Sequence, residues 1–119
     1  MIRILLVVDD EPDITTLIRR LLKRSFDEIH VAASGAEASE VLARSPVTHL
    51  VTDFFLGVRE PQGSTLVAEW RAAHPSIRFA AVFTGRVSTK DIAGLPGIDA
   101  VYAKPAGFEH LLDELRAAS

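Results

Sequence analysis

Five side chains whose chemistry suits phosphate or metal binding each follow a short apolar run. Asp9 and Asp10 follow the first run, Asp53 the third, Thr84 the fourth and Lys104 the fifth. In folds built on a parallel sheet, ligands bind in the crevice outside the carboxyl ends of the strands. If the runs are such strands, we expect all five side chains to meet at one edge of the sheet.

Three carboxylates at one place need positive charge beside them. Two carboxylates roughly 5 Å apart repel by about 3 kcal/mol at an effective dielectric of about 20. Lys104 supplies one positive charge, and a hard, oxygen-preferring cation such as Mg²⁺ would supply the rest. An aspartate beside Mg²⁺ and a lysine can attack phosphorus and form an acyl phosphate. Taken singly, the acids have plainer interpretations, because Asp9 and Asp10 can cap a helix and Asp53 can be a loop residue.

An alternation of strands and helices must position these residues. Apolar, largely β-branched runs predict strands at residues 2–8, 29–32, 49–52, 77–83 and 101–103, and the first is apolar enough to be covered on both faces. Helical patterns separate the strands. Five strands alternating with four or five helices predict an α/β fold, a doubly wound five-stranded parallel sheet with helices on both faces.

The sequence patterns that predict the helices differ in strength from one segment to the next. The first has apolar residues at helical spacing and predicts an amphipathic helix: Ile14, Leu17, Ile18, Leu21 and Leu22. It ends in a cluster of cations, which is either a solvated face or a surface for an acidic partner: Arg19, Arg20, Lys23 and Arg24. Ser34 and Glu37 form a capping box that opens the second helix. Two further helices are predicted from residue 64 to 73 and from residue 108 onward.

Two segments contain helix-breaking residues. Residues 54–63 include two glycines and a proline, which predicts a loop. Residues 88–99 contain Gly94, Pro96 and Gly97, so any helix there is limited to about two turns. The fourth helix is therefore expected to be short or disordered.

The composition excludes several classes of protein. The 119 residues fit one domain, and 48% hydrophobic with 24% charged residues is an ordinary globular balance. The net charge of −3 argues against general attraction to nucleic acid or anionic membranes. The absence of cysteine removes disulfides, thiol catalysis and cysteine-bound metals. With no membrane-length apolar run and no signal-peptide pattern, we expect a cytoplasmic protein that binds neither membrane nor nucleic acid directly.

Taken together, these motifs resemble the receiver domain of two-component response regulators. Val8–Asp9–Asp10–Glu11–Pro12, Asp53, Thr84–Gly85 and Lys104–Pro105 stand after the first, third, fourth and fifth strands, in the family's order. The resemblance covers the whole chain and implies a single receiver (response regulatory) domain over residues 1–119. It also implies a flavodoxin-like sheet of strand order 2-1-3-4-5 and a cis peptide bond between Lys104 and Pro105.

The resemblance further implies a role for each site residue. Asp53 would accept a phosphoryl group in a Mg²⁺-dependent reaction, Thr84 would donate a hydrogen bond to that group, and Lys104 would pair with it. Asp10 would bind the metal directly and Asp9 chiefly through water. The protein ligands of the metal would be Asp9, Asp10, Asp53 and the main-chain carbonyl of Phe55.

A receiver of this kind takes its phosphoryl group from a sensor histidine kinase or a histidine phosphotransfer protein. It then changes its interaction with a downstream protein target. By this resemblance the chain would phosphorylate itself and slowly dephosphorylate itself, without being an enzyme toward an external substrate.

Three departures from the family pattern keep an alternative open. The loop after Asp53 is about two residues longer, the fourth helix is weak, and Val101 stands where the family usually has an aromatic residue. Tyr102 is expected to be a packing residue on the other side of the strand. The alternative is a receiver-fold interaction module that works without phosphorylation. A small Mg²⁺-dependent phosphohydrolase of the haloacid dehalogenase type is disfavoured, because it needs an aspartate where this chain has Glu11, and a larger domain.

Overall fold

Five parallel strands form the central sheet of the computed structural model, which describes residues 2–54, 63–85 and 89–119. Neighbouring strands pair in the order β2-β1-β3-β4-β5, and every pairing is parallel. The strands are β1 (Ile4–Val8), β2 (Glu28–Ala32), β3 (His49–Thr52), β4 (Phe79–Thr84) and β5 (Ala100–Ala103). The predicted sheet and its order are confirmed.

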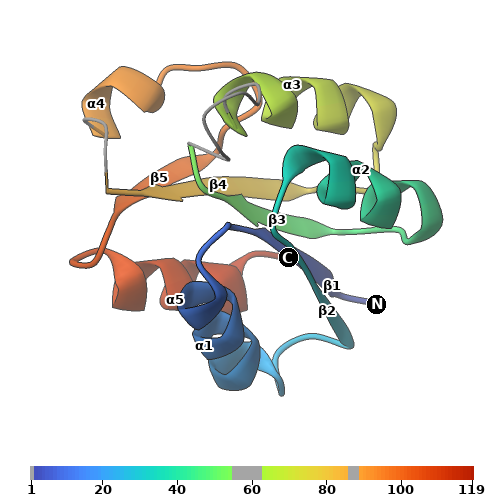
Figure 1. Ribbon diagram of the computed structural model, residues 1–119, viewed down its shortest axis with the longest axis horizontal. Helices are drawn as coiled ribbons and strands as arrows, with labels where there is room; N and C mark the ends of the chain where they lie inside the picture. Colours follow the sequence, from blue (N-terminus) through green and yellow to red (C-terminus); the bar gives the residue numbers. More distant parts are fainter. Residues whose placement is uncertain (1, 55–62, 86–88) are drawn as a thin grey trace.

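Helices cover both faces of this sheet, as Figure 1 shows. α1 (Pro12–Leu22) and α5 (Phe108–Ala117) lie side by side on one face. The opposite face carries α2 (Gly35–Arg44), α3 (Gly63–Ala73) and the short α4 (Thr89–Ile92). Within the described ranges, no helix is both long enough and apolar enough to cross a lipid bilayer.

The two faces of the sheet bury separate apolar clusters, and β1 contributes to both. All five of its residues are buried. Ile4, Leu6 and Val8 belong to the cluster under α2 and α3. Leu5 and Val7 belong to the cluster under α1 and α5. Alternate residues of β1 thus point to opposite faces of the sheet, and helices cover both faces. This explains why the predicted run does not alternate between polar and apolar residues.

The helix starts agree with the sequence signals. Pro12 occupies the first position of α1, where a missing N–H costs nothing. At α2, the Glu37 main-chain N–H donates to Ser34 Oγ at 3.2 Å. The Glu37 carboxylate returns a contact by accepting from the Ala33 N–H at 3.1 Å, one residue before the expected partner. The predicted capping box is present in this slightly shifted form.

The predicted amphipathic helix is confirmed, but two of its apolar residues do not reach the core. Ile18 and Leu22 are fully buried, but Leu17 is 41% exposed and Leu21 is 43% exposed. The buried stripe of α1 is narrow and consists of Thr15, Ile18 and Leu22. Because α5 lies beside α1, Leu21 lines a surface groove between the two helices instead of entering the core.

The weak fourth helix is confirmed, because α4 has four residues. The chain then returns to β5 through Gly97, whose φ of 82° lies in the left-handed region that favours glycine. Asp99 fixes this return, since its carboxylate accepts from Arg71 at 2.6 Å and from the Ala80 N–H at 2.8 Å. Gly63, placed in the loop by the sequence analysis, is the first residue of α3, and residues 55–62 lie outside the described ranges.

Candidate functional site

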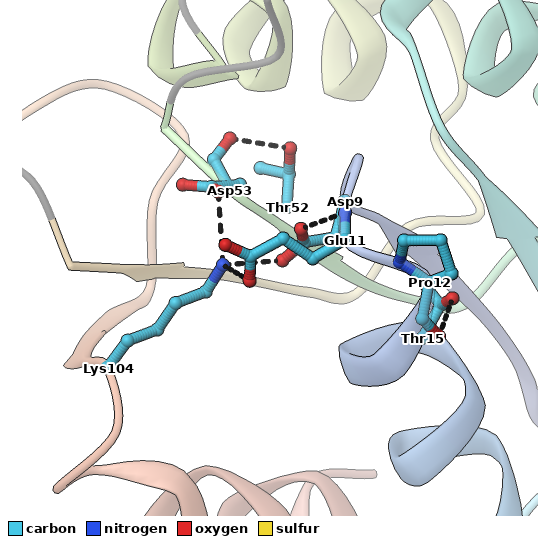
Figure 2. A network of polar contacts seen from close by, with 7 residues as sticks. All are labelled: Asp9, Glu11, Pro12, Thr15, Thr52, Asp53 and Lys104. Carbon is cyan, nitrogen blue, oxygen red and sulfur yellow. Dashed lines mark hydrogen bonds and ion pairs between the residues drawn. The ribbon is translucent and has the colours of Figure 1, made fainter.

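A lysine surrounded by three carboxylates lies at the carboxyl edge of the sheet, as Figure 2 shows. Lys104 Nζ donates to Asp9 Oδ2 at 2.8 Å, to Asp53 Oδ2 at 3.1 Å and to Glu11 Oε2 at 3.2 Å. The Lys104 and Asp9 side chains are well buried, whereas the Glu11 side chain is 55% exposed. The fold thus joins residues separated by about 95 positions in the chain.

Main-chain hydrogen bonds continue past the strand ends and fix these residues. The Asp9 N–H donates to Ala32 O at 3.0 Å, and the Asp53 N–H donates to Val8 O at 2.9 Å. The Lys104 N–H donates to Thr84 O at 3.0 Å. Asp9, Asp53 and Lys104 are therefore each one position beyond a strand, and the main-chain hydrogen bond fixes the Cα position of each. The Lys104–Pro105 peptide bond is cis, as the family resemblance implied.

Three aspartates at this edge can offer oxygen atoms to a single cation. Carboxylate oxygens of Asp9, Asp10 and Asp53 all lie within 4.8 Å of one another. Asp9 is 4% exposed and Asp53 is 9% exposed, while Asp10 faces solvent. An all-oxygen set that is open on one side suits a hard divalent cation that keeps some of its water. Phe55, the fourth predicted ligand, lies outside the described residues.

The electrostatics of the pair at the centre of the site favour a further cation. Burial raises the pKa of Asp9 above its ordinary value, and the hydrogen bonds from Lys104 and the Glu11 N–H only partly oppose this. Burial alone would lower the pKa of Lys104, but its hydrogen bond to Asp9 and the charge of Asp53 outweigh burial and raise it. Lys104 therefore stays charged, and Asp9 gains from any additional positive charge placed beside it.

Thr84 ends β4 at the same edge with an unsatisfied hydroxyl. The residue is 1% exposed, and within residues 2–54, 63–85 and 89–119 its Oγ1 has no hydrogen-bond partner. A buried hydroxyl without a partner costs about 1–3 kcal/mol. An anionic oxygen bound beside Lys104 would give this hydroxyl an acceptor.

The structure brings most of the predicted site residues together and adds Glu11, which was not predicted as a site residue. Asp9, Asp10, Asp53 and Lys104 lie together, and Thr84 ends the adjacent strand. Glu11 was quoted only as part of a motif. Glu11 stands two residues after Asp9 and directly before Pro12. This closeness in the sequence indicated that its side chain could reach the carboxyl edge of the sheet.

The predicted position of Tyr102 is confirmed. Its side chain is 8% exposed within the cluster under α1 and α5, and its ring lies 5.3 Å from that of His110 in an edge-on arrangement. Val101 is half-buried and belongs to neither cluster. Tyr102 is thus a packing residue rather than a displaced member of the site.

The solved structures similar to this chain include receiver domains. The signal receiver domain of an HD domain-containing protein from Pseudomonas fluorescens Pf-5 has a TM-score of 0.84 and 26% identity, covering 99% of this chain and 94% of that one. A response regulator protein from Burkholderia pseudomallei, solved with a phosphorylated aspartic acid, a calcium ion and citrate, has a TM-score of 0.79 and 26% identity. That match covers 95% of this chain and 66% of the other.

Two curated relatives match part of the chain. A response regulator NtrX-like protein of Rickettsia bellii is 33% identical over 70 residues, which is 59% of this chain and 15% of the relative. The sensor histidine kinase TmoS of Ectopseudomonas mendocina is 36% identical over 66 residues, which is 56% of this chain and 6% of the kinase. The matched segment is a small part of both relatives.

No family model matches the chain. The fold nevertheless agrees with the similar solved structures, both in the order of its strands and in the site at the carboxyl edge of the sheet. The chain therefore has the receiver fold and is similar to receiver domains of response regulators.

Proposed function

We propose that this chain, as one receiver domain over residues 1–119, is the phosphoacceptor of a two-component phosphorelay. Asp53 takes the phosphoryl group from a phosphohistidine of a sensor kinase or a histidine phosphotransfer protein. The observation that carries this proposal is the position of Asp53, 3.1 Å from Lys104 Nζ and grouped with the oxygens of Asp9 and Asp10. Two carboxylates, a lysine and an open face are what a nucleophilic aspartate needs to meet a phosphoryl group.

The transfer exchanges one bond to phosphorus for another. A carboxylate oxygen of Asp53 forms a bond to phosphorus as the phosphorus–nitrogen bond of the donor breaks. The bonding pair returns to the imidazole nitrogen, which takes up a proton. Lys104 already donates to Asp53 and can follow the new charge onto the phosphoryl oxygens. The buried hydroxyl of Thr84 then donates to one of those oxygens, which resolves its unsatisfied state.

The metal in this proposal is Mg²⁺, held by Asp9, Asp10 and Asp53 with the carbonyl of Phe55. When bound, it neutralises charge on the phosphoryl oxygens during transfer. The all-oxygen donor set and the raised pKa of Asp9, caused by its burial, support a hard cation here. The phosphorylated aspartic acid and calcium ion in the Burkholderia pseudomallei regulator support the same arrangement.

The output of such a domain is a change in protein binding. We therefore propose a downstream protein target, with no direct contact to nucleic acid or membrane, and no turnover of an external substrate beyond slow self-dephosphorylation. A cytoplasmic location remains a prediction.

Intact-mass spectrometry tests the chemistry directly. The protein is mixed with Mg²⁺ and phosphoramidate, a small donor with a phosphorus–nitrogen bond. We expect one added phosphoryl group, which disappears in Asp53→Asn and when EDTA removes the metal. The matched control is Asp113→Asn, an exposed aspartate of α5, which should keep the adduct. Absence of the adduct in the parent, together with no change in the NMR spectrum on adding beryllofluoride, would contradict the proposal.

A second candidate is a receiver-fold interaction module that works without phosphorylation. α4 of four residues and Val101 in β5 favour it, because both depart from the switching elements expected of the family. The same mass spectrometry separates the two candidates, because a module that has lost phosphorylation would gain no phosphoryl group from phosphoramidate, as parent protein or as Asp53→Asn.

A further inference from the structure

Phe83 brings an aromatic ring close to the acidic site. The residue stands directly before Thr84 in β4, and its side chain is 1% exposed in the cluster under α1 and α5. Lys104 Nζ lies over this ring, 5.5 Å from its centre. A cation over the face of a ring and within about 6 Å of its centre is attracted by the negative charge of the π system. Phe83 is therefore a neighbour of the charged group that the proposed phosphoryl transfer uses.

The packing around Phe83 fixes its ring. The ring of Phe108, the first residue of α5, lies 5.8 Å from it in a tilted arrangement. Because the core around a buried side chain is close-packed, the Phe83 ring has no free volume in which to turn away from Lys104. The ring is thus a fixed feature of the site, whereas the long side chain of Lys104 can move.

Lys104 must change its hydrogen bonds during phosphoryl transfer. Its ammonium group has three N–H donors, and they already have carboxylate acceptors in Asp9, Asp53 and Glu11, as Figure 2 shows. A phosphoryl oxygen that binds Lys104 therefore replaces one of these acceptors. The exchange takes place where the Lys104 side chain is 13% exposed, so water replaces a lost hydrogen bond poorly.

Two groups act on the ammonium group from opposite environments during this exchange. As an oxygen of Asp53 bonds to phosphorus, that carboxylate loses its negative charge and its hold on Lys104. Glu11 is 55% exposed and keeps its charge, so it draws the ammonium group toward solvent. The buried ring of Phe83 draws it toward the core, and this attraction does not depend on which acceptors the N–H donors use. The ring therefore matters most when Asp53 releases Lys104.

We propose that Phe83 is a positioning residue for Lys104, whose ammonium group its ring holds beside Asp53 against the pull of Glu11 during phosphoryl transfer. This inference rests on the proposed phosphoacceptor function. Phe83 makes and breaks no bond, and the proton stays on Lys104 throughout. The rate of transfer should consequently depend on the negative charge of the ring face, and not only on the volume that the ring fills.

A series of fluorinated rings tests this dependence. Phe83 is replaced in turn by 4-fluoro-, 3,5-difluoro- and 3,4,5-trifluorophenylalanine, which nearly keep the shape of the ring and weaken the negative charge of its face step by step. Circular dichroism checks that each protein is folded. With Mg²⁺ and phosphoramidate, we expect the initial rate of phosphorylation, measured by intact-mass spectrometry, to fall at each step and by about threefold over the series.

Two controls separate positioning from packing. Trifluorophenylalanine in place of Phe108, which packs beside Phe83, should leave the parent rate unchanged. In Glu11→Gln the series at Phe83 should lower the rate by less than about 1.5-fold, because the competing carboxylate is gone. A rate that is independent of fluorination at Phe83, or that falls equally for Phe108, overturns the inference.

A resting-state measurement checks the contact without phosphorylation. The chain has three lysines, Lys23, Lys90 and Lys104, so Lys104→Arg identifies the Lys104 Hε signal in an NMR spectrum. We expect this signal upfield of the other two in the parent and close to them in Phe83→Leu, and an unshifted signal in the parent overturns the inference. A parent protein that shows the shift but gains no phosphoryl group would contradict the phosphoacceptor function itself, and the positioning role would fall with it.

Discussion

At the residue scale, Lys104 is shared among more carboxylates than the phosphoacceptor chemistry requires. Asp9 and Asp53 are part of the acidic site, but Glu11 adds a third partner at 3.2 Å from an exposed position. In the proposed reaction Lys104 must turn toward the incoming phosphoryl group. Glu11 opposes this step twice, since it competes for the ammonium group and repels an anionic donor.

We therefore predict that Glu11→Gln is phosphorylated faster than the parent. Because an exposed ion pair contributes about 0.2–1 kcal/mol, the initial rate with phosphoramidate should rise by up to about fivefold. The rate is measured by intact-mass spectrometry at matched Mg²⁺ concentrations. Glu109→Gln, at an exposed position in the first turn of α5, is the control and should react at the parent rate. A slower reaction in Glu11→Gln would show that Glu11 positions Lys104 rather than restrains it.

At the element scale, substituting two adjacent residues of α1 in turn tests which side chains hold this helix on the sheet. Ile18 is fully buried under the sheet, whereas its neighbour Leu17 is 41% exposed. Ile18→Ala should lower the free energy of unfolding by about 2–4 kcal/mol, the cost of a core cavity. Leu17→Ala should lower it by less than about 1 kcal/mol. Urea denaturation measures both, and comparable losses would show that Leu17 is buried in solution.

The end of α5 is held at the amino edge of the sheet by a half-buried arginine and a buried histidine. The Arg3 guanidinium donates to Leu115 O at 2.8 Å and to Ala118 O at 3.0 Å, and it lies over the Phe26 ring. His49 is completely buried in β3. Its Nε2 donates to Ala118 O at 2.9 Å, and its Nδ1 lies 2.7 Å from Thr48 Oγ1. The neutral imidazole is the form that suits this position beside Arg3.

This arrangement predicts a stability loss in mild acid. Burial lowers the pKa of His49, with the charges of Arg3 and Arg78 acting in the same direction and the bond to Ala118 opposing them. The unfolded chain therefore takes up this proton first as the pH falls below the ordinary value of 6.5. Above pH 6.5, the contribution of the neutral His49 side chain to the free energy of unfolding is fully present. Below it, stability falls by at most about 1.4 kcal/mol per pH unit until the folded pKa is reached.

Urea denaturation between pH 5 and pH 8 measures this slope. His49→Gln should be less stable at neutral pH, because it loses one of the two buried hydrogen bonds, and its stability should depend less on pH than that of the parent. His110→Gln, whose side chain is 70% exposed in the parent, should keep the parent's pH dependence. An unchanged slope in His49→Gln would mean that other groups cause the acid sensitivity.

At the scale of the whole molecule, the parts that the sequence predicted are those fixed by main-chain periodicity. Asp9, Asp53 and Lys104 each end an apolar run, and strands of a parallel sheet bring such ends together whatever the side chains do. The third partner of Lys104 was not predictable in this way, because the contact with Glu11 depends on how two long side chains bend across 93 positions. The exposure of Leu17 depends on which neighbour covers the helix, and the periodicity of one segment carries no such information.

The acidic site lies at the carboxyl edge of the sheet, whereas Arg3 and His49 hold the end of α5 at the amino edge, and phosphorylation should affect the two edges unequally. α4 has four residues and follows β4, whose last residue Thr84 is expected to bind the phosphoryl group. Residues 93–99 belong to no helix or strand, so the amides of this segment should exchange fast at rest. With Mg²⁺ and beryllofluoride, a stable phosphoryl mimic, we expect slower hydrogen exchange in residues 89–99. Residues 115–119, which end α5 at the amino edge, should be unchanged. Asp53→Asn is the control that should show no change anywhere. Slowing spread evenly over both edges would instead indicate that the ligand stabilises the whole fold without switching one segment.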